Sequence, residues 1–309
     1  MITPTCTQHE WHAPGGEAFP YSLWGGDLPP EEKPAAVVVA IHGLSGAAID
    51  FEPLGSHLAR HRVVTLAPEL RGQGNDPEES RRGDLEKIED WFRDLSAFFL
   101  LVRSRYPDTP VYYYGESLGA ALLIRFLAQA LALEQPAGVV LASPVVAFKE
   151  KPSWWQETVF RVLLRLRPRH RVDVRKYTKR EKDGPSKWVT RDEAHRNWFR
   201  DAPHRIEFFT MRFFKCVHDI ITGCMAAAPQ VRVPTLLVYA ANDVFITTAQ
   251  VEKFFERIGS SDKELQLFPE SYHLLLHDFD KTQALERIEG WLLGRIEKAS
   301  NLRAGALKR

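Results

Sequence analysis

Short apolar runs alternate with amphipathic segments through most of the chain. Residues 35–41 form a continuous apolar run, which is typical of a strand buried on both faces, and further strand candidates lie at 62–67, 111–115, 138–142, 235–240 and 264–268. Over residues 84–105, apolar side chains recur at steps of three and four, which predicts a helix with Asp84 as its N-cap. Strands that alternate with helices predict an α/β fold, with a mostly parallel central sheet flanked by helices.

The alternation breaks between residues 148 and 230. This stretch has no run typical of a buried strand and is rich in aromatic residues, so we interpret it as a helical cap inserted over the carboxyl edge of the sheet. Residues 1–147 and 231–298 then form the α/β core, which opens with a hairpin over 8–13 and 18–24. Residues 299–309 are expected to form a frayed, mildly basic tail. Within the cap, Thr190 and Glu193 have the spacing of a capping box.

Composition and charge exclude several classes of protein. The chain of 309 residues carries 41 Lys and Arg against 40 Asp and Glu. This balance gives no strong positive electrostatic field that would attract nucleic acid. Its apolar runs are too short to span a bilayer, and its first residues lack the basic start and apolar stretch of a secretory signal. Three cysteines without a disulfide framework are typical of a reducing compartment. We therefore expect a cytoplasmic protein.

The most informative motif is Gly115-Glu116-Ser117-Leu118-Gly119, which directly follows the strand candidate at 111–115 and precedes an apolar helical segment at 118–133. A sharp turn from a strand into a helix needs small residues two places before and after its central residue. Such a turn lifts the serine hydroxyl clear of the sheet, at the N-terminus of the helix. We predict Ser117 as a nucleophile, the alternative being a glycine-rich structural turn.

A serine nucleophile needs a base, and the base needs an acid that holds its tautomer. Asp243 directly follows the strand candidate at 235–240, and His273 follows the one at 264–268. Both side chains are therefore expected at the edge of the sheet where Ser117 lies. The weaker alternatives are His277 for the base, and Asp219 and Asp278 for the acid.

Two backbone N–H groups are expected to stabilise an oxyanion beside Ser117. One belongs to Leu118, at the start of the predicted helix, and the other to Leu44, in the loop after the strand candidate at 35–41. We interpret His42 in the same loop as a structural hydrogen-bonding residue rather than a catalyst.

Histidine pairs occur at His9 and His12 and at His57 and His61. The first pair lies on a predicted edge strand and the second on a solvated helix face, and the sequence places no cluster of carboxylates or cysteines beside either. We therefore predict no metal site.

These motifs resemble the α/β-hydrolase superfamily, and within it the monoacylglycerol lipase and lysophospholipase branch with its serine aminopeptidase S33-type relatives. The segments that carry the resemblance are His42-Gly43-Leu44, Arg71-Gly72-Gln73-Gly74, Gly115-Glu116-Ser117-Leu118-Gly119, Val233-Pro234 and Ser271-Tyr272-His273. The resemblance implies a serine hydrolase of carboxylic esters that forms an acyl-enzyme and needs no metal or cofactor. Two positions depart from the pattern: Glu116 stands where this branch often has histidine, and Glu69 where aspartate is more usual.

Two other functions stay open from the sequence. An aminopeptidase or amidase of the same fold would need a carboxylate cluster in the cap to hold an amine, and the acids of the cap are scattered. A non-catalytic binding protein on this fold would tend to lose members of the triad, and this chain keeps all three.

The expected partner is a small-molecule acyl ester. Trp154, Trp155, Phe209 and Phe213 of the cap either line an acyl pocket or pack the cap onto the core, and the sequence favours neither. Residues 161–182 hold ten Lys or Arg against two acids, which is consistent with contact with an anionic lipid surface or with a solvated cap face. Oligomeric state is left open.

Overall fold

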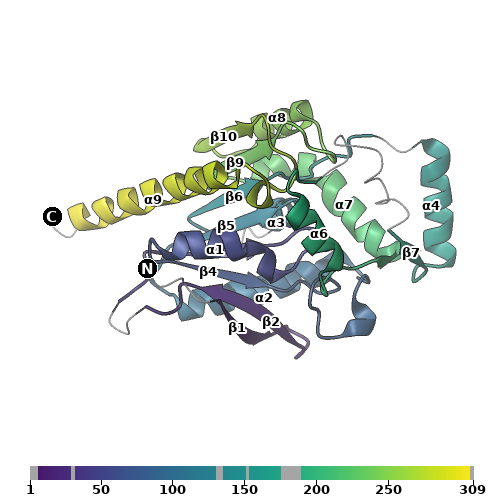
Figure 1. Cartoon of the computed structure of the whole chain (residues 1–309), viewed down its shortest axis with the longest axis horizontal. Coiled ribbons are helices and arrows are strands. Elements are labelled where there is room, and N and C mark those ends of the chain that lie inside the picture. Colours follow the sequence, from purple (N-terminus) through teal and green to yellow (C-terminus); the bar gives the residue numbers. More distant parts are fainter. Residues whose placement is uncertain (1–5, 29–31, 130–134, 151–152, 175–188, 307–309) are drawn as a thin grey trace.

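Eight strands form one central sheet (Figure 1). The computed structural model describes residues 6–28, 32–129, 135–150, 153–174 and 189–306. In spatial order the strands are β1 (Thr7–His12), β2 (Ala18–Trp24), β4 (Val63–Pro68), β3 (Ala36–Ile41), β5 (Val111–Glu116), β6 (Gly138–Ala142), β9 (Thr235–Ala240) and β10 (Lys263–Phe268). β1 and β2 form an antiparallel hairpin joined to β4, and from β4 to β10 every neighbouring pair is parallel. The predicted hairpin and the mostly parallel sheet are confirmed.

Helices cover both faces of this sheet. α1 (Glu52–Ala59) and α9 (Lys281–Ala306) pack on one face, and α2 (Ile88–Arg105), α3 (Leu118–Gln129) and α8 (Thr248–Arg257) pack on the other. Along β3, Val37 and Val39 enter one hydrophobic core while Ala36 and Val38 enter the other. Because successive side chains point to opposite faces and both faces are covered, every position of the strand is apolar.

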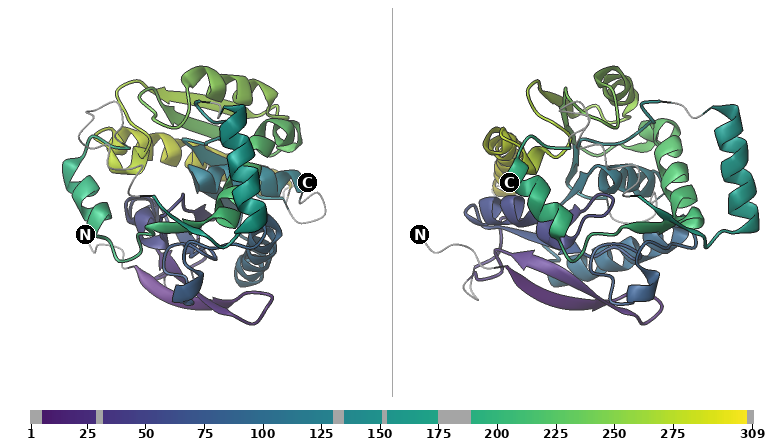
Figure 2. Two further views of the ribbon diagram at one scale, coloured as in Figure 1. Left: turned by 90° about the vertical axis from the view of Figure 1, so that its right-hand side faces the viewer. Right: turned by 45° about the vertical axis from the view of Figure 1, so that its right-hand side comes forward.

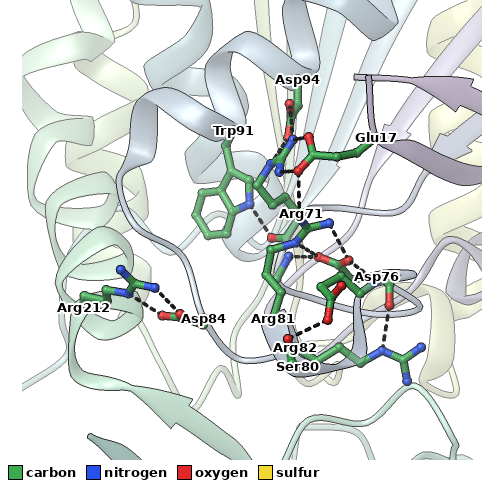
Figure 3. A network of polar contacts seen from close by, with 12 residues as sticks. Glu17, Arg71, Asp76, Ser80, Arg81, Arg82, Asp84, Trp91, Asp94 and Arg212 are labelled. Atoms are coloured by element: carbon green, nitrogen blue, oxygen red, sulfur yellow. Dashed lines mark hydrogen bonds and ion pairs between the residues drawn. The ribbon is translucent and has the colours of Figure 1, made fainter. Parts of the chain in front are cut away.

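The predicted start of α2 is wrong. The helix begins at Ile88, with Lys87 at the N-cap position. The Asp84 carboxylate instead accepts a hydrogen bond from Arg212 Nε at 2.7 Å (Figure 3) and another from Thr210 Oγ1 at 2.6 Å. These partners lie at the start of α7 (Met211–Ala227), so Asp84 ties the loop before α2 to a distant helix.

The predicted cap contains α4 (Trp154–Leu166), α6 (Glu193–Asp201) and α7, together with an unexpected pair of short antiparallel strands, β7 (Arg171–Asp173) and β8 (Phe208–Thr210). α6 is capped by Asp192, whose side chain accepts from His195 N, so the predicted cap at Thr190 is wrong. α7 packs on α3, and its buried face joins the hydrophobic core of the sheet. Figure 2 shows α4 as the outermost helix, beside α7.

Short 3-10 turns complete the described elements, at Ala48–Phe51, Glu79–Arg81, Ala228–Gln230 and Leu275–His277. α9 extends to Ala306, so residues 299–306 continue a helix and do not form the frayed tail that was expected. Residues 130–134, at the end of the helix predicted over 118–133, and residues 307–309 lie outside the described part. Within the described part, no helix is both long enough and apolar enough to cross a membrane.

Candidate active site

Ser117 is the single residue between β5 and α3. Its φ of 55° is left-handed, a conformation that non-glycine residues adopt rarely and at a cost in strain. Its backbone N–H donates to the Ala142 carbonyl of β6 at 2.9 Å, and its own carbonyl accepts from Ala121 N at 3.1 Å. The turn is therefore held from both sides, at the carboxyl ends of two adjacent strands.

The two glycines of the motif are required by close contacts. A Cβ atom on Gly115 would lie 2.6 Å from Ala120 Cα, and one on Gly119 would lie 2.1 Å from the Ile41 carbonyl oxygen. Both are backbone atoms that cannot move aside as a flexible side chain would. The predicted strand–turn–helix geometry around Ser117 is confirmed.

Ser117, His273 and Asp243 meet in one hydrogen-bonded chain. Ser117 Oγ lies 2.8 Å from His273 Nε2, and His273 Nδ1 lies 2.6 Å from Asp243 Oδ2. An ionised carboxylate can only accept, so Nδ1 carries the proton and the Nε2 lone pair faces the serine hydroxyl. This is the tautomer that removes a proton from a serine nucleophile.

The second carboxylate oxygen of Asp243 is held by the backbone. Asp243 Oδ1 accepts from Phe245 N at 2.8 Å and from Ile246 N at 3.3 Å, while Lys149 Nζ donates to the Asp243 carbonyl at 2.8 Å. These contacts leave Oδ2 directed at His273. The ring of Phe245 meets the His273 ring edge-on, with the centroids 4.7 Å apart.

The pKa of His273 is raised above its usual 6.5 by a balance of opposing causes. Burial acts to lower it, but the charge and hydrogen bond of Asp243, together with the charge of Glu116, outweigh the burial. The imidazole is therefore a stronger base than a free histidine.

Asp278, the rival acid, holds the loop that carries His273. Its Oδ2 accepts from Tyr272 N at 2.6 Å and its Oδ1 accepts from Arg191 Nε at 3.2 Å, while Leu274 N donates to the Val189 carbonyl at 2.9 Å. The residues on either side of His273 are thus anchored, in part by residues 189–191 of the cap. Sequence reasoning missed this function because half of the partners come from a distant segment.

The other rival residues are also structural. His277 Nε2 donates to the Asp50 carbonyl at 2.9 Å, and its ring stacks on His195 with the centroids 4.0 Å apart. Burial, with the charge of His195, lowers the pKa of His277 to about 3, so this ring stays neutral. Asp219 lies on α7 and pairs with Lys215.

The loop after β3 passes directly beside Ser117. A Cβ atom on Gly43 would lie 3.1 Å from Ser117 Cβ. His42 Nδ1 donates to the Gly43 carbonyl at 2.9 Å and its Nε2 accepts from Leu70 N at 3.2 Å, while burial lowers its pKa to about 4. The predicted structural role of His42 is confirmed. Leu118 is the first residue of α3, where a backbone N–H has no acceptor within the helix.

The Arg71-Gly72-Gln73-Gly74 motif supports this loop from the neighbouring strand. Gln73 Oε1 accepts from Ser45 N at 3.0 Å. Arg71 bridges Glu17 and Asp94 through bonds of 2.7 Å, and its carbonyl accepts from Trp91 Nε1 at 2.9 Å (Figure 3). The motif is therefore structural, and it fixes the backbone of the loop beside Ser117.

Glu116 and Asp50 are two further carboxyls buried at the site. Burial raises the pKa of each to about 7, and the charge of Glu116 adds to the shift of Asp50. Among the described residues, neither Glu116 Oε1 nor Asp50 Oδ1 has a hydrogen-bond partner. Asp50 Oδ2 accepts from Ala47 N at 2.9 Å, and its Oδ1 lies 3.6 Å from His204 Nε2. Because burial disfavours the ionised form of a carboxyl, both groups stay protonated up to about pH 7.

We expect Glu116→Gln to stabilise the protein at alkaline pH. The pKa of Glu116 rises from 4.5 to about 7 on folding, so its stabilising neutral form is fully present below pH 4.5 and is lost as the pH rises through 7. That difference corresponds to about 3 kcal/mol of unfolding free energy, which the amide would not lose. Urea unfolding at pH 5 and pH 8.5 measures it, with the exposed Glu270→Gln as the control. If Glu116→Gln and the parent lost equal amounts of stability between pH 5 and pH 8.5, the raised pKa of Glu116 would be contradicted.

The four candidate pocket residues are not gathered in one place. Phe209 and Phe213 are fully buried, and the Phe213 ring meets Trp91 edge-on with the centroids 5.7 Å apart. This favours packing of the cap on the core for both phenylalanines. Trp154 and Trp155 lie on α4 with 79% and 54% of their surface exposed, and their contact with substrate stays a prediction.

A mostly parallel sheet covered on both faces by helices, with a serine elbow followed along the chain by an aspartate and a histidine, defines an α/β hydrolase. The chain belongs to the serine aminopeptidase S33 family, whose sequence profile matches residues 32–280.

Curated relatives and solved structures extend this likeness over most of the chain. An uncharacterized abhydrolase domain-containing protein of Dictyostelium discoideum is 26% identical over 88% of this chain, which spans only 28% of that protein. A monoglyceride lipase of Rattus norvegicus is 23% identical over 87% of this chain and 86% of its own length. A soluble variant of the Saccharomyces cerevisiae monoglyceride lipase, solved with a substrate analog, has the same fold, with a TM-score of 0.78 and 19% identity over 96% of both chains.

Proposed function

We propose that this chain is a serine hydrolase of carboxylic esters, with Ser117, His273 and Asp243 as its catalytic triad. The observation that carries the proposal is the continuous Ser117–His273–Asp243 hydrogen-bond chain of 2.8 and 2.6 Å at the carboxyl edge of the sheet. The backbone N–H groups of Leu44 and Leu118 are proposed as the oxyanion hole, because the loop after β3 and the start of α3 flank the serine.

In the first half of the reaction, His273 Nε2 takes the proton of the Ser117 hydroxyl as Oγ attacks the ester carbonyl carbon. The carbonyl oxygen becomes an oxyanion and accepts hydrogen bonds from the two backbone N–H groups. When the intermediate collapses, the bond to the alcohol oxygen breaks and the imidazolium returns its proton to that oxygen. The alcohol leaves, and the acyl group stays on Ser117.

In the second half, water replaces the alcohol. His273 Nε2 takes a proton from water as its oxygen attacks the acyl carbon, and the proton then goes to Ser117 Oγ as the acyl bond breaks. Free acid and the original serine are the products. Asp243 keeps Nδ1 protonated throughout and stabilises the imidazolium in both halves.

Monoacylglycerols are the substrate class we propose, on the basis of the activity in the name of the monoglyceride lipase relative, and the resemblance of the sequence motifs adds lysophospholipids. Residues 1–147 and 231–298 are proposed as the catalytic core and residues 148–230 as the cap, although α7 shares the core of the sheet. The cytoplasm is the proposed location, because Cys6, Cys216 and Cys224 are all free, as a reducing compartment would keep them.

α4 is proposed to contact a lipid surface. None of its residues is buried, and its exposed apolar side chains include Trp155, Val159, Val162 and Leu166, which recur at steps of three and four. Arg161 and Arg165 lie between them on the same helix. An apolar stripe flanked by arginines is the pattern of a helix that lies in an anionic membrane interface. Of the basic segment at 161–182, residues 175–182 lie outside the described part.

The described cap gives little support for an aminopeptidase. Capture of a substrate amine needs carboxylates that converge on one point. Glu157 instead pairs with Arg161 on α4, and Asp192 caps α6. An ester hydrolase is therefore the better supported function within this family.

A substrate panel tests the proposal. We expect hydrolysis of p-nitrophenyl esters and monoacylglycerols but not of amino-acid p-nitroanilides. If the cap encloses an acyl groove, kcat/KM should rise about three- to fourfold per methylene, the equivalent of about 0.8 kcal/mol, until the groove is full. Trp155→Asp should lower the rate of hydrolysis of monoacylglycerol in anionic vesicles. It should leave the rate with a soluble short-chain ester unchanged. Anilide hydrolysis without ester hydrolysis would overturn the proposed function.

A further inference from the structure

His57 of α1, His61 in the turn directly after this helix and Glu289 of α9 converge on the face of the sheet covered by α1 and α9. The helix ends at Ala59, and the following turn, in which His61 N donates to the Leu58 carbonyl at 2.9 Å, brings the His61 ring beside that of His57. The sequence places no cluster of carboxylates or cysteines near them, but the fold brings the single carboxylate of Glu289 in α9 against both rings. Both imidazoles are half-buried, so the expectation of a solvated helix face is wrong at this position.

The three side chains present their donor atoms to one another at close range. His57 Nε2 lies 2.6 Å from Glu289 Oε2, and His61 Nε2 lies 3.0 Å from Glu289 Oε1. The three candidate ligand atoms all lie within 4.8 Å of one another, and the centroids of the two imidazoles are 6.2 Å apart. Ligand atoms about 2.1 Å from a tetrahedral Zn²⁺ ion are about 3.4 Å apart, so rotamer adjustments alone would allow an ion between them.

We propose that His57, His61 and Glu289 form a binding site for a divalent transition-metal ion of the zinc class. Two imidazole nitrogens and one carboxylate oxygen are the donors that Zn²⁺, Co²⁺ and Ni²⁺ prefer, whereas Mg²⁺ and Ca²⁺ require oxygen ligands. The side chains keep 17%, 34% and 20% of their surface exposed, which gives an ion and a water molecule in the fourth position access to the site.

The location gives this site a structural consequence. α1 follows β3 near the start of the chain, and α9 is the last helix, so a shared ion would cross-link two segments that are far apart in sequence. An ion that binds only the folded chain stabilises it in proportion to its occupancy.

Zinc binding to the full chain, purified without a histidine tag and treated with a chelator, tests the proposal. Calorimetry should show uptake of one equivalent of Zn²⁺, and Co²⁺ should give the visible absorption of a tetrahedral site. At zinc concentrations about 100-fold above Kd, Tm should rise by about 5 °C, while Mg²⁺ should leave it unchanged.

Matched variants locate the site. His57→Ala and Glu289→Gln should each abolish the zinc-dependent rise in Tm, and Glu289→Gln keeps a side chain able to accept hydrogen bonds from the imidazoles should the alanine variant fail to fold. His12→Ala, on an exposed position of β1, should retain the full rise. A Kd weaker than about 1 mM, or a rise that persists in both site variants, would overturn the proposal and leave the trio as histidine–carboxylate pairs.

Discussion

Replacing Ser117 by alanine is expected to lower kcat for ester hydrolysis by a factor on the order of a million, because removal of the nucleophile of a serine hydrolase removes the acyl-enzyme route entirely. The fold should remain intact. The backbone bonds to Ala142 and Ala121 hold the left-handed φ of 55° at Ser117 and do not involve its side chain, so alanine should keep the same turn. Single-turnover kinetics with p-nitrophenyl butyrate and a thermal unfolding curve measure the two effects.

Ser143 provides a matched control for this substitution. It lies directly after β6, it is fully buried and its φ of 43° is also left-handed, but within the described part its Oγ has no hydrogen-bond partner. We expect Ser143→Ala to keep nearly full activity. A fluorophosphonate probe should label the parent and Ser143→Ala but not Ser117→Ala. Labelling of Ser117→Ala, or equal losses of activity in the two variants, would place the nucleophile elsewhere.

Features that depend on local periodicity and sterics could be predicted from the sequence. The buried strands are apolar because both faces of the sheet are covered. Glycine is needed on either side of Ser117 because a Cβ atom at Gly115 or Gly119 would lie 2.6 or 2.1 Å from a neighbouring backbone atom. Asp243 and His273 could be placed because each lies in the loop after a strand, and the carboxyl ends of parallel strands meet at one edge of the sheet.

Features that depend on partners from distant segments could not be predicted. The sequence predicts Asp84 as a helix N-cap, but in the structure Thr210 and Arg212 bind its carboxylate. From the sequence Asp278 is an alternative to Asp243 as the partner of the histidine, but in the structure its carboxylate binds Arg191 and the backbone next to His273. Each of these carboxylates makes a tertiary contact. The periodicity of the sequence does not indicate which distant segment contains its partner.

Replacing His273 by alanine is expected to lower kcat by nearly as much as the loss of Ser117, because without the base the serine proton has no acceptor. His277→Ala should lower kcat by about tenfold at most, with a loss of about 1–3 kcal/mol in stability from its hydrogen bond to the Asp50 carbonyl. A larger loss of kcat for His277→Ala than for His273→Ala would show that the base has been misassigned.

The pH dependence of the parent enzyme gives a second test of His273. The base must be neutral to accept a proton, so kcat/KM should fall as the pH drops through the pKa of His273. Burial alone would lower that pKa, but the charges of Asp243 and Glu116 raise it above 6.5, so activity should begin to fall at a pH higher than that of a free imidazole. Glu116 becomes ionised as the pH rises through about 7, and Glu116→Gln removes that charge while the Asp243 hydrogen bond remains, so the acid limb of kcat/KM should move to lower pH. An acid limb below pH 6.5 in the parent, or one that Glu116→Gln moves to higher pH, would contradict this account of the electrostatics around His273.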